Sequence, residues 1–250
     1  MNRTPFALLA VLAIALSASA TTVSFAPPAG GFPTAGGPLP GNATTTTIGG
    51  IVIDGYTLSG GTGPSNLSAA PLFGRNEGTA DQGIGICSVG ETCTVPGGGD
   101  SNELSNETNQ EVLRLTLPSG NSWVSVALSS LDNNGGGTPE RGLLLTDGPN
   151  NTFTVICAFA GGGPAASGVL SPCSQAGGTS VAPVFAIPTA YAGSLHLYFV
   201  PFDWNGHNTN NDFLVAGATI TSTVPEPGSL ALMGSGLLAL AGAVRRRIRL

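Results

Sequence analysis

A succession of short apolar runs separated by turn-forming residues limits the folds open to this chain. From Ile48 onward, runs such as IGGIVIDGYTL, EVLRLTL, TFTVICAFA and DFLVAGATITST alternate with clusters of glycine, asparagine and proline. Within EVLRLTL, Leu115 and Leu117 share one face of an extended chain, and Arg114 and Thr116 share the other. Short alternating runs rich in β-branched residues are typical of strands. We therefore expect an all-β fold, a single β-sandwich or jelly-roll-like domain over residues 48–223.

The composition allows one such domain in a chain of 250 residues. Hydrophobic residues make up 41% of the chain, which is enough for a core, whereas charged residues make up only 9%. Residues 21–47 are rich in proline, glycine and threonine and contain APPAGGFPTAGGPLPGNATTTT. This segment indicates a linker or an extended N-terminal arm, with TVSF as a candidate edge strand.

The N-terminus has the three parts of a secretory signal peptide in the usual order. Arg3 supplies a positive charge, Phe6–Leu16 is almost entirely apolar, and Ala18 and Ala20 bracket Ser19 as a small-residue cleavage site. The apolar run is too short to span a bilayer, so the alternative to a signal peptide is a buried N-terminal helix. We expect residues 1–20 to be a signal peptide that directs export.

The charge of the body between the two ends excludes one class of partner. Its basic residues are Arg75, Arg114 and Arg141, and thirteen carboxylates oppose them, so its formal charge is 3 − 13 = −10. A surface this anionic repels phosphate backbones, so we expect no nucleic-acid partner.

The four cysteines are Cys87, Cys93, Cys157 and Cys173. An even number in an exported chain indicates disulfides, and pairing each cysteine with its neighbour closes two short loops. Two other connectivities exist, and a metal site is the rival interpretation. A metal site favours closer C-x-x-C spacing or nearby histidines, whereas His196 and His207 lie far along the chain. We predict structural disulfides.

The C-terminus joins a proline-rich hinge, an apolar span and a basic cluster. Pro227–Val244 is eighteen residues without a charge, close to the roughly 20 needed to cross a bilayer. Such a span flanked by arginines predicts a transmembrane helix with its basic end in the cytoplasm. An ordinary permanent membrane anchor is the alternative. The basic residues are Arg245, Arg246, Arg247 and Arg249.

With Val224, Pro225, Glu226 and Pro227 before it, this C-terminal segment of residues 224–250 resembles the PEP-CTERM sorting domain of exported bacterial proteins. The same segment is also catalogued as an ice-binding protein C-terminal domain, a label that does not imply ice binding. The resemblance implies recognition and processing near the PEP motif by an exosortase, a membrane protease. It also implies passage through the secretion translocon, transient insertion in the inner membrane of a Gram-negative bacterium, and association with exopolysaccharide or biofilm.

The body resembles a recurring type among such proteins in the strand Gly83–Ile86 and the segment Asn102–Asn106, a likeness that implies no known activity. The chain contains no H-E-x-x-H, no G-x-S-x-G and no phosphate-binding glycine loop. His196 alternates with apolar neighbours and is expected to be a strand residue, and His207 lies in a predicted loop. We expect no catalytic residues and no enzymatic activity.

Calcium is the candidate ligand for which the sequence offers the most binding residues, because two stretches are dense in oxygen donors. Neither stretch has EF-hand spacing, and aspartate, asparagine and glycine are also ordinary turn residues. No other cofactor is expected. The candidate ligands are Asp100, Asn102, Glu103 and Asn106 in the first stretch, and Asp203, Asn205 and Asp212 in the second.

A glycan surface is the second candidate site, with Trp204 and Trp123 as the stacking residues. Trp204 stands beside Asn205 and Gly206 in a predicted loop, whereas Trp123 falls within a predicted strand and has burial in the core as its alternative. From all of this we expect a structural or adhesive protein of the cell surface or extracellular matrix. The alternatives are a carbohydrate-binding module and, third, a secreted hydrolase.

Overall fold

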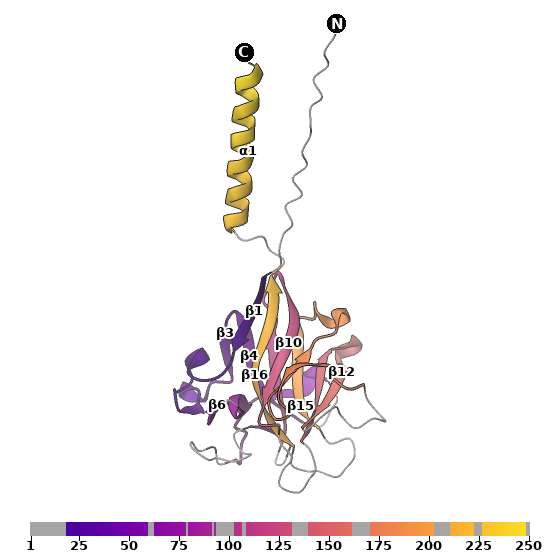
Figure 1. Ribbon diagram of the computed structural model, residues 1–250. Coiled ribbons are helices and arrows are strands. Elements are labelled where there is room, and N and C mark those ends of the chain that lie inside the picture. Colours follow the sequence, from indigo (N-terminus) through magenta and orange to yellow (C-terminus); the bar gives the residue numbers. More distant parts are fainter. Residues whose placement is uncertain are drawn as a thin grey trace. The chain divides into compact units, whose positions relative to one another are not determined.

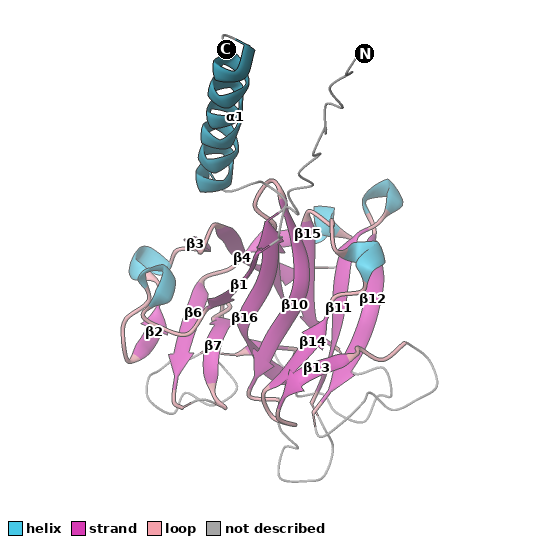
Figure 2. Ribbon diagram, turned by 45° about the horizontal axis from the view of Figure 1, so that its top comes forward, coloured by secondary structure: helices cyan, strands magenta, loops and turns pink. Residues whose placement is uncertain are grey.

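The expected strands form, and they pair into two antiparallel sheets (Figure 1, Figure 2). The structure is a computed structural model, and a compact unit spans Ala20–Ser222 within it. The flanking segments, Met1–Ser19 and Thr223–Leu250, form a separate unit. The described residues are 19–59, 63–78, 80–91, 93, 103–106, 109–131, 140–161, 171–202, 211–222 and 227–248.

The first sheet has nine strands, ordered β13-β14-β10-β16-β7-β6-β2, with β1 and β8 also paired to β16. Its centre is the long pair β10 and β16, which run side by side in both ribbon views (Figure 1, Figure 2). The strand bounds are β1 Ser19–Ser24, β2 Gly36–Pro38, β6 Leu72–Asn76, β7 Gln82–Ile86, β8 Leu104–Ser105, β10 Asn121–Ser129, β13 Gln175–Gly178, β14 Pro183–Ala186 and β16 Asp212–Ser222.

The second sheet has seven strands, ordered β12-β11-β15-β9-β4-β3, with β5 also paired to β4. Short 3₁₀ turns join several strands, among them η5 (Pro149–Asn151) and η6 (Thr189–Tyr191). The strand bounds are β3 Thr45–Ile48, β4 Ile51–Leu58, β5 Leu67–Ala69, β9 Gln110–Thr116, β11 Arg141–Asp147, β12 Phe153–Ala160 and β15 His196–Pro201.

The main core draws side chains from both sheets, as two sheets packed face to face require. On β9, Leu113 and Leu115 are fully buried in this core, and Arg114 between them points to the other face. The first sheet contributes Val126, Phe213 and Val215, among other buried residues. The alternation predicted within EVLRLTL is confirmed.

A smaller apolar cluster lies on the outer face of the second sheet. Val112, Leu145, Tyr198 and Val200 are buried there, with Phe153 packed against them. Adjacent strand residues therefore bury their side chains on opposite sides of the sheet. This explains why strands such as β11 are buried along nearly their whole length.

The composition of residues 21–47 indicated a linker or an extended arm, but these residues belong to the folded domain. They supply β1, β2 and β3, and the backbone N–H of Phe25 donates a hydrogen bond of 2.9 Å to the carbonyl of Ala216 on β16. The physical reason is that Phe25, Phe32 and Leu39 are buried in the main core. These three apolar side chains are far apart in the sequence, and their burial fixes the segment against the sheets. The average composition of the segment is nevertheless typical of a linker.

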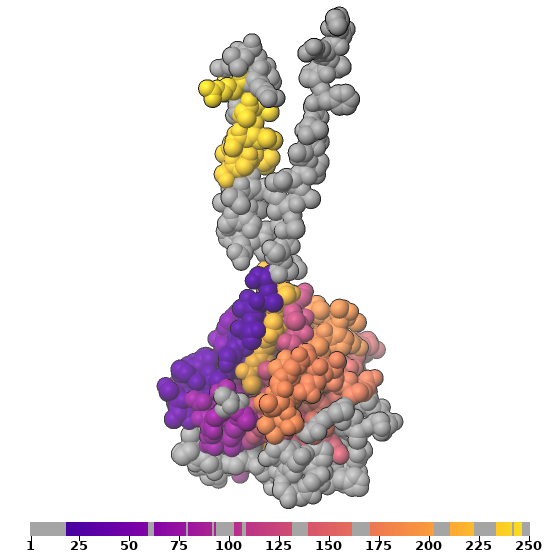
Figure 3. Space-filling model, viewed as in Figure 1, coloured from indigo at the N-terminus to yellow at the C-terminus, as the bar shows by residue number. Residues whose placement is uncertain are grey.

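The two ends of the compact unit leave from the same end of the first sheet. The Thr22 and Thr219 hydroxyls are hydrogen-bonded at 3.0 Å, and the beginning of β1 thereby lies beside the end of β16. The space-filling view shows the indigo first strand and the final strand next to each other at the surface (Figure 3). We call this end of the two sheets, where Ser19 and Ser222 lie, the terminus end.

A helix, α1 (Pro227–Ile248), forms over the apolar span and the first arginines. Within the described residues, no helix meets both the length and the apolar character needed to cross a membrane. The transmembrane helix predicted from the sequence is therefore not found. Glycine at positions 228, 234, 236 and 242 adds almost no apolar surface to the helix, which weakens the hydrophobic contribution of the segment.

Candidate functional site

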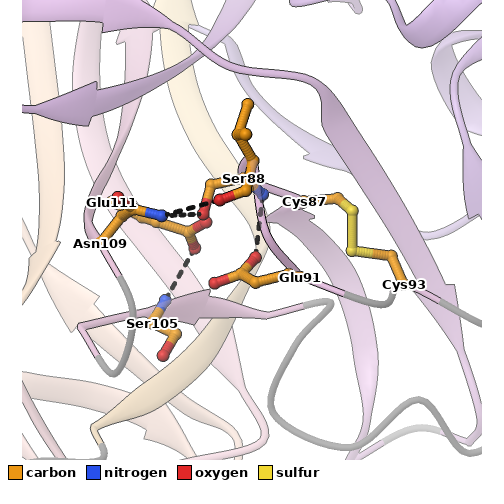
Figure 4. The surroundings of a disulfide bond; sticks show 8 residues. Cys87, Ser88, Glu91, Cys93, Ser105, Asn109 and Glu111 are labelled. Atoms are coloured by element: carbon orange, nitrogen blue, oxygen red, sulfur yellow. Dashed lines mark hydrogen bonds between the residues drawn. A yellow bond between two sulfur atoms is a disulfide. The ribbon is translucent and has the colours of Figure 1, made fainter.

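Both disulfides have the predicted neighbour pairing. Cys87 is bonded to Cys93 and Cys157 to Cys173, which are 6 and 16 residues apart in the sequence. Cys157 on β12 and Cys173 lie in the main core. The first disulfide closes a loop that follows β7 (Figure 4). The sequence therefore predicted both the role and the partners of these cysteines.

The Cys87–Cys93 loop packs against a buried carboxyl group (Figure 4). Glu111, the second residue of β9, is fully buried, and its Oε2 accepts a 2.9 Å hydrogen bond from the backbone N–H of Ser105. Asn109 donates its side-chain amide to the Ser88 hydroxyl at 3.0 Å. Burial and the nearby Glu91 carboxyl raise the pKa of Glu111 well above its usual range. Sequence reasoning did not identify Glu111.

The fold brings the two predicted oxygen-rich stretches together. Strand β8 pairs with the start of β16, with Asp212 opposite Ser105. Asn106 Oδ1 accepts a hydrogen bond of 2.9 Å from the backbone N–H of Asn211. Glu103 and Asp212 are both buried and close enough for their charges to interact. Asp100, Asn102, Asp203 and Asn205 lie outside the described residues.

Arg75, which the sequence reasoning did not connect to any site, holds this region together. Its guanidinium forms ion pairs with Glu103, with Asp81 at 2.8 Å and with Glu77 at 3.4 Å. The Ser130 hydroxyl donates a further hydrogen bond of 2.8 Å to Glu103 Oε1. Burial and Asp212 raise the pKa of Glu103 well above its usual range, although Arg75 opposes the shift. The Arg75 guanidinium thus forms ion pairs with three carboxylates.

These contacts bear on the calcium prediction. Asn106 Oδ1 and one oxygen of Glu103 are already bound within the protein. Among the described residues, the one group of three suitable ligands is Cys87, Glu91 and Cys93, whose two sulfurs form a disulfide and are not free thiolates. Calcium binding stays a prediction that depends on the loops outside the described residues.

Trp123 is not a glycan contact, because its side chain belongs to the core. It is 2% exposed, and its indole N–H donates a 2.8 Å hydrogen bond to the carbonyl of Ser194. Its position on β10 directs the ring between the sheets, as alternation along a strand requires. Trp204 lies outside the described residues. Phe202, 38% exposed, is the one large aromatic side chain found exposed within the described part of the chain.

A polar network crosses the outer face of the second sheet. Asp147 at the end of β11 accepts the Tyr198 hydroxyl at 2.8 Å and lies 2.7 Å from His196 Nδ1. Arg114 donates two hydrogen bonds to Asp54, at 2.9 and 3.1 Å. His196 is on strand β15, as predicted. The network joins neighbouring strands. Burial raises the pKa of Tyr198, so this phenol stays protonated.

The prediction that the protein is not an enzyme stays a prediction.

Apart from Ala20, the residues predicted for export and sorting lie in the two flanking segments. Ala20 is the second residue of β1, and Ala18 lies outside the described residues. In α1, Arg245 and Arg246 are exposed, and Arg247 is part of the helix. Val224, Pro225, Glu226 and Arg249 lie outside the described residues, and Pro227 is the first residue of α1.

Comparison with known proteins identifies the C-terminal segment alone. The family model of the PEP-CTERM protein-sorting motif matches residues 223–247. Neither the curated proteins nor the solved structures gave a match to the chain. The resemblance inferred for the C-terminus is therefore confirmed, and the two-sheet body is characterised by its own geometry.

Proposed function

From the PEP-CTERM motif at its C-terminus, which indicates an exported protein sorted by an exosortase, we propose that the protein is delivered to the cell surface or the extracellular matrix. The motif is the observation that carries the proposal. It contains a recognised tripeptide, an apolar segment and a basic cluster in a fixed order. The released product would be the two-sheet domain, because β16 ends at Ser222, two residues before the motif's Val224.

A cleaved signal peptide is the N-terminal half of this proposal. Cleavage after Ala20 would make Thr21 the first residue of the mature protein. The contacts that hold β1 to β16 involve Thr22 and Phe25, so they would survive the cleavage. The fold thus supports a mature domain that begins close to the predicted site.

We further propose that the domain is a structural or adhesive component of exopolysaccharide or biofilm. A core shared by two sheets, two disulfides and a strongly acidic body suit a durable extracellular protein. The alternative, a carbohydrate-binding module, needs exposed rings on which sugars stack. Because Trp123 is buried, that alternative now depends on Trp204.

The sorting proposal is tested by replacing Pro225, Glu226 and Pro227 with alanine in the full chain. We expect unprocessed protein to accumulate in the inner membrane, measured by fractionation and by the intact mass. The matched control replaces Ser171, Ser174 and Ser180, which are exposed and lie far from the motif in the sequence, with alanine. Normal release and unchanged mass of the motif variant would overturn the proposal.

The two roles of the domain are separated by a binding measurement on residues Thr21–Val224. The host's purified exopolysaccharide is the ligand, with calcium or with chelator. Saturable binding that Trp204→Ala abolishes would establish the carbohydrate-binding module. No binding in either buffer supports the structural role, and calcium-dependent binding would locate the ligands in the loops of Asp100 and Asp203.

A further inference from the structure

A buried carboxyl group beside the Cys87–Cys93 disulfide has only one of its two oxygens satisfied. Glu111, on β9, is fully buried, and the backbone N–H of Ser105 donates to its Oε2. Its other oxygen, Oε1, is buried and has no hydrogen-bond partner within the described part of the chain. A buried carboxylate oxygen without a donor costs free energy, so the position of Oε1 suits a proton or a cation.

Glu91 supplies a second carboxyl at the same place. The carboxyls of Glu91 and Glu111 point toward one another (Figure 4), close enough for one of them, when protonated, to donate a hydrogen bond to the other. Two ionised carboxylates repel each other strongly in a buried site, so a positive charge must accompany the second ionisation. Burial and, after it, the proximity of Glu91 raise the pKa of Glu111. A proton or a cation is therefore needed to hold the pair together.

The loop that carries Glu91 is fixed in place. The Cys87–Cys93 disulfide closes it, and the backbone N–H of Ser88 donates a 2.9 Å hydrogen bond to Glu91 Oε2. Asn109 donates its side-chain amide to the Ser88 hydroxyl at 3.0 Å and to the Val89 carbonyl at 3.3 Å. These contacts join the loop to the residues that lead into β9. The two carboxyls are thus preorganised, as ligands of one ion must be.

The chemistry of this place suits a hard cation. The sulfurs of Cys87 and Cys93 are bonded to each other, so they cannot act as thiolate ligands for zinc. The Ser88 hydroxyl lies beside the Glu111 carboxyl and adds a neutral oxygen to the two carboxyls. Val89 is 92% exposed, so the loop over the pair lies at the surface. Calcium accepts irregular sets of oxygen ligands, whereas magnesium demands a nearly ideal octahedron.

We propose that Glu91 and Glu111 are the ligands of a calcium ion that bridges their carboxyls and locks the disulfide-closed loop to β9. This site is separate from the two oxygen-rich stretches predicted from the sequence, and it does not depend on the proposed sorting function. With two charged protein ligands, its expected affinity is that of weak extracellular calcium modules, a Kd of about 10⁻⁴–10⁻³ M. In metal-free buffer a shared proton holds the pair instead.

Calcium titration of the full chain tests the inference. Calorimetry measures the affinity, and the melting temperature is compared between calcium and chelator; we expect saturable binding and a higher melting temperature in calcium. Glu111→Gln and Glu91→Gln keep oxygen acceptors but remove a charge, so each should weaken binding about tenfold or more. Asp147→Asn is the matched control. Its side chain is 42% exposed at the end of β11, beside His196, and its removal should leave the affinity unchanged.

Glu91 is only partly buried, so Glu91→Gln decides the matter should Glu111→Gln fail to melt cooperatively in chelator. No calcium binding by the unaltered chain would show that a proton alone holds the pair, and it would overturn the inference. Binding that is unchanged in both variants would place the ion elsewhere, for instance in the loops of Asp100 and Asp203, and would overturn it as well. An equal response to magnesium would overturn the assignment of calcium. Processing at the sorting motif is unaffected by any of these results.

Discussion

Glu111 on β9 and Ser105 on β8 are joined by a 2.9 Å hydrogen bond in which the backbone N–H of Ser105 donates to the buried carboxyl. β8 has only two residues, Leu104 and Ser105, and it pairs with the start of β16. The carboxyl therefore anchors a very short strand that brings the two oxygen-rich stretches together. Because this carboxyl is wholly buried next to Glu91, its protonation state affects the stability of the whole region.

We expect the free energy of unfolding to decrease with pH above about pH 5. The pKa of Glu111 is raised in the folded state, so its contribution is fully present below the unfolded-state value of about 4.3 and is lost as the pH rises through the folded value. Glu103 acts in the same direction. Glu111→Gln keeps an acceptor for Ser105 and cannot ionise, so it should flatten part of this slope. Chemical denaturation between pH 5 and 8 measures it.

The control for this prediction is Gln175→Ala, at an exposed residue that has no ionisable group. The pH dependence of its unfolding free energy should match that of the unaltered protein. A Glu111→Gln variant with an undiminished pH dependence would contradict the assignment of the titration to this site.

Arg75→Met should destabilise the domain by about 3–5 kcal/mol, because it leaves Glu103 buried without its ion-pair partner. Arg75→Lys keeps the positive charge and should recover only part of the lost stability, since an ammonium cannot contact three carboxylates with the same geometry. Arg114→Met is the matched control. Its side chain is 26% exposed in the pair with Asp54, and we expect a loss of roughly 1 kcal/mol. Urea titrations compare the three variants, and equal losses at both arginines would refute the role given to Arg75.

Loss of the Cys157–Cys173 disulfide should cost more than loss of Cys87–Cys93. Their sequence separations of 16 and 6 correspond to roughly 3 and 2 kcal/mol of loop-closure entropy. Cys157 and Cys173 also lie in the main core. Paired cysteine-to-serine variants, compared by thermal melting with intact-mass confirmation of the remaining disulfide, test this order. The reverse order would show that the Cys87 loop has a larger structural role than its length implies.

Gly217→Ala should weaken the attachment of β1 to β16. A Cβ at this position would lie 2.6 Å from the backbone carbonyl oxygen of Val23, so the strands must separate. We expect a destabilisation of about 1–3 kcal/mol and faster amide exchange in residues 22–25. Gly177→Ala on β13 is the control, because a Cβ at that position would meet no described atom within 4 Å. Similar effects at both glycines would indicate that β1 contributes little to the fold.

Several properties of the protein follow from local sequence patterns. The period-two alternation around Leu115 predicts strands because neighbouring side chains of an extended chain point to opposite faces. The spacing of four cysteines predicted the disulfide partners, and the ordered C-terminal motif identified the sorting segment. Each of these signals lies within a few residues or in a fixed order along the chain, so no long-range contact is needed to recognise it.

Other properties depend on pairings between distant residues. Phe25, Phe32 and Leu39 are isolated apolar residues in a proline- and glycine-rich segment. Only the packing of the two sheets shows that these three side chains are buried in the core. Trp123 could be either core or surface until the orientation of β10 was known.

The class of fold, the disulfides and the sorting segment were thus predictable from the amino-acid sequence. Which charges meet is settled by the tertiary structure. Arg75 and Glu103 are 28 residues apart in the chain, and the association of Glu103 with Asp212 depends on the pairing of β8 with β16. The physical reason is that strand register and sheet order result from the burial of the whole core, which no local pattern encodes.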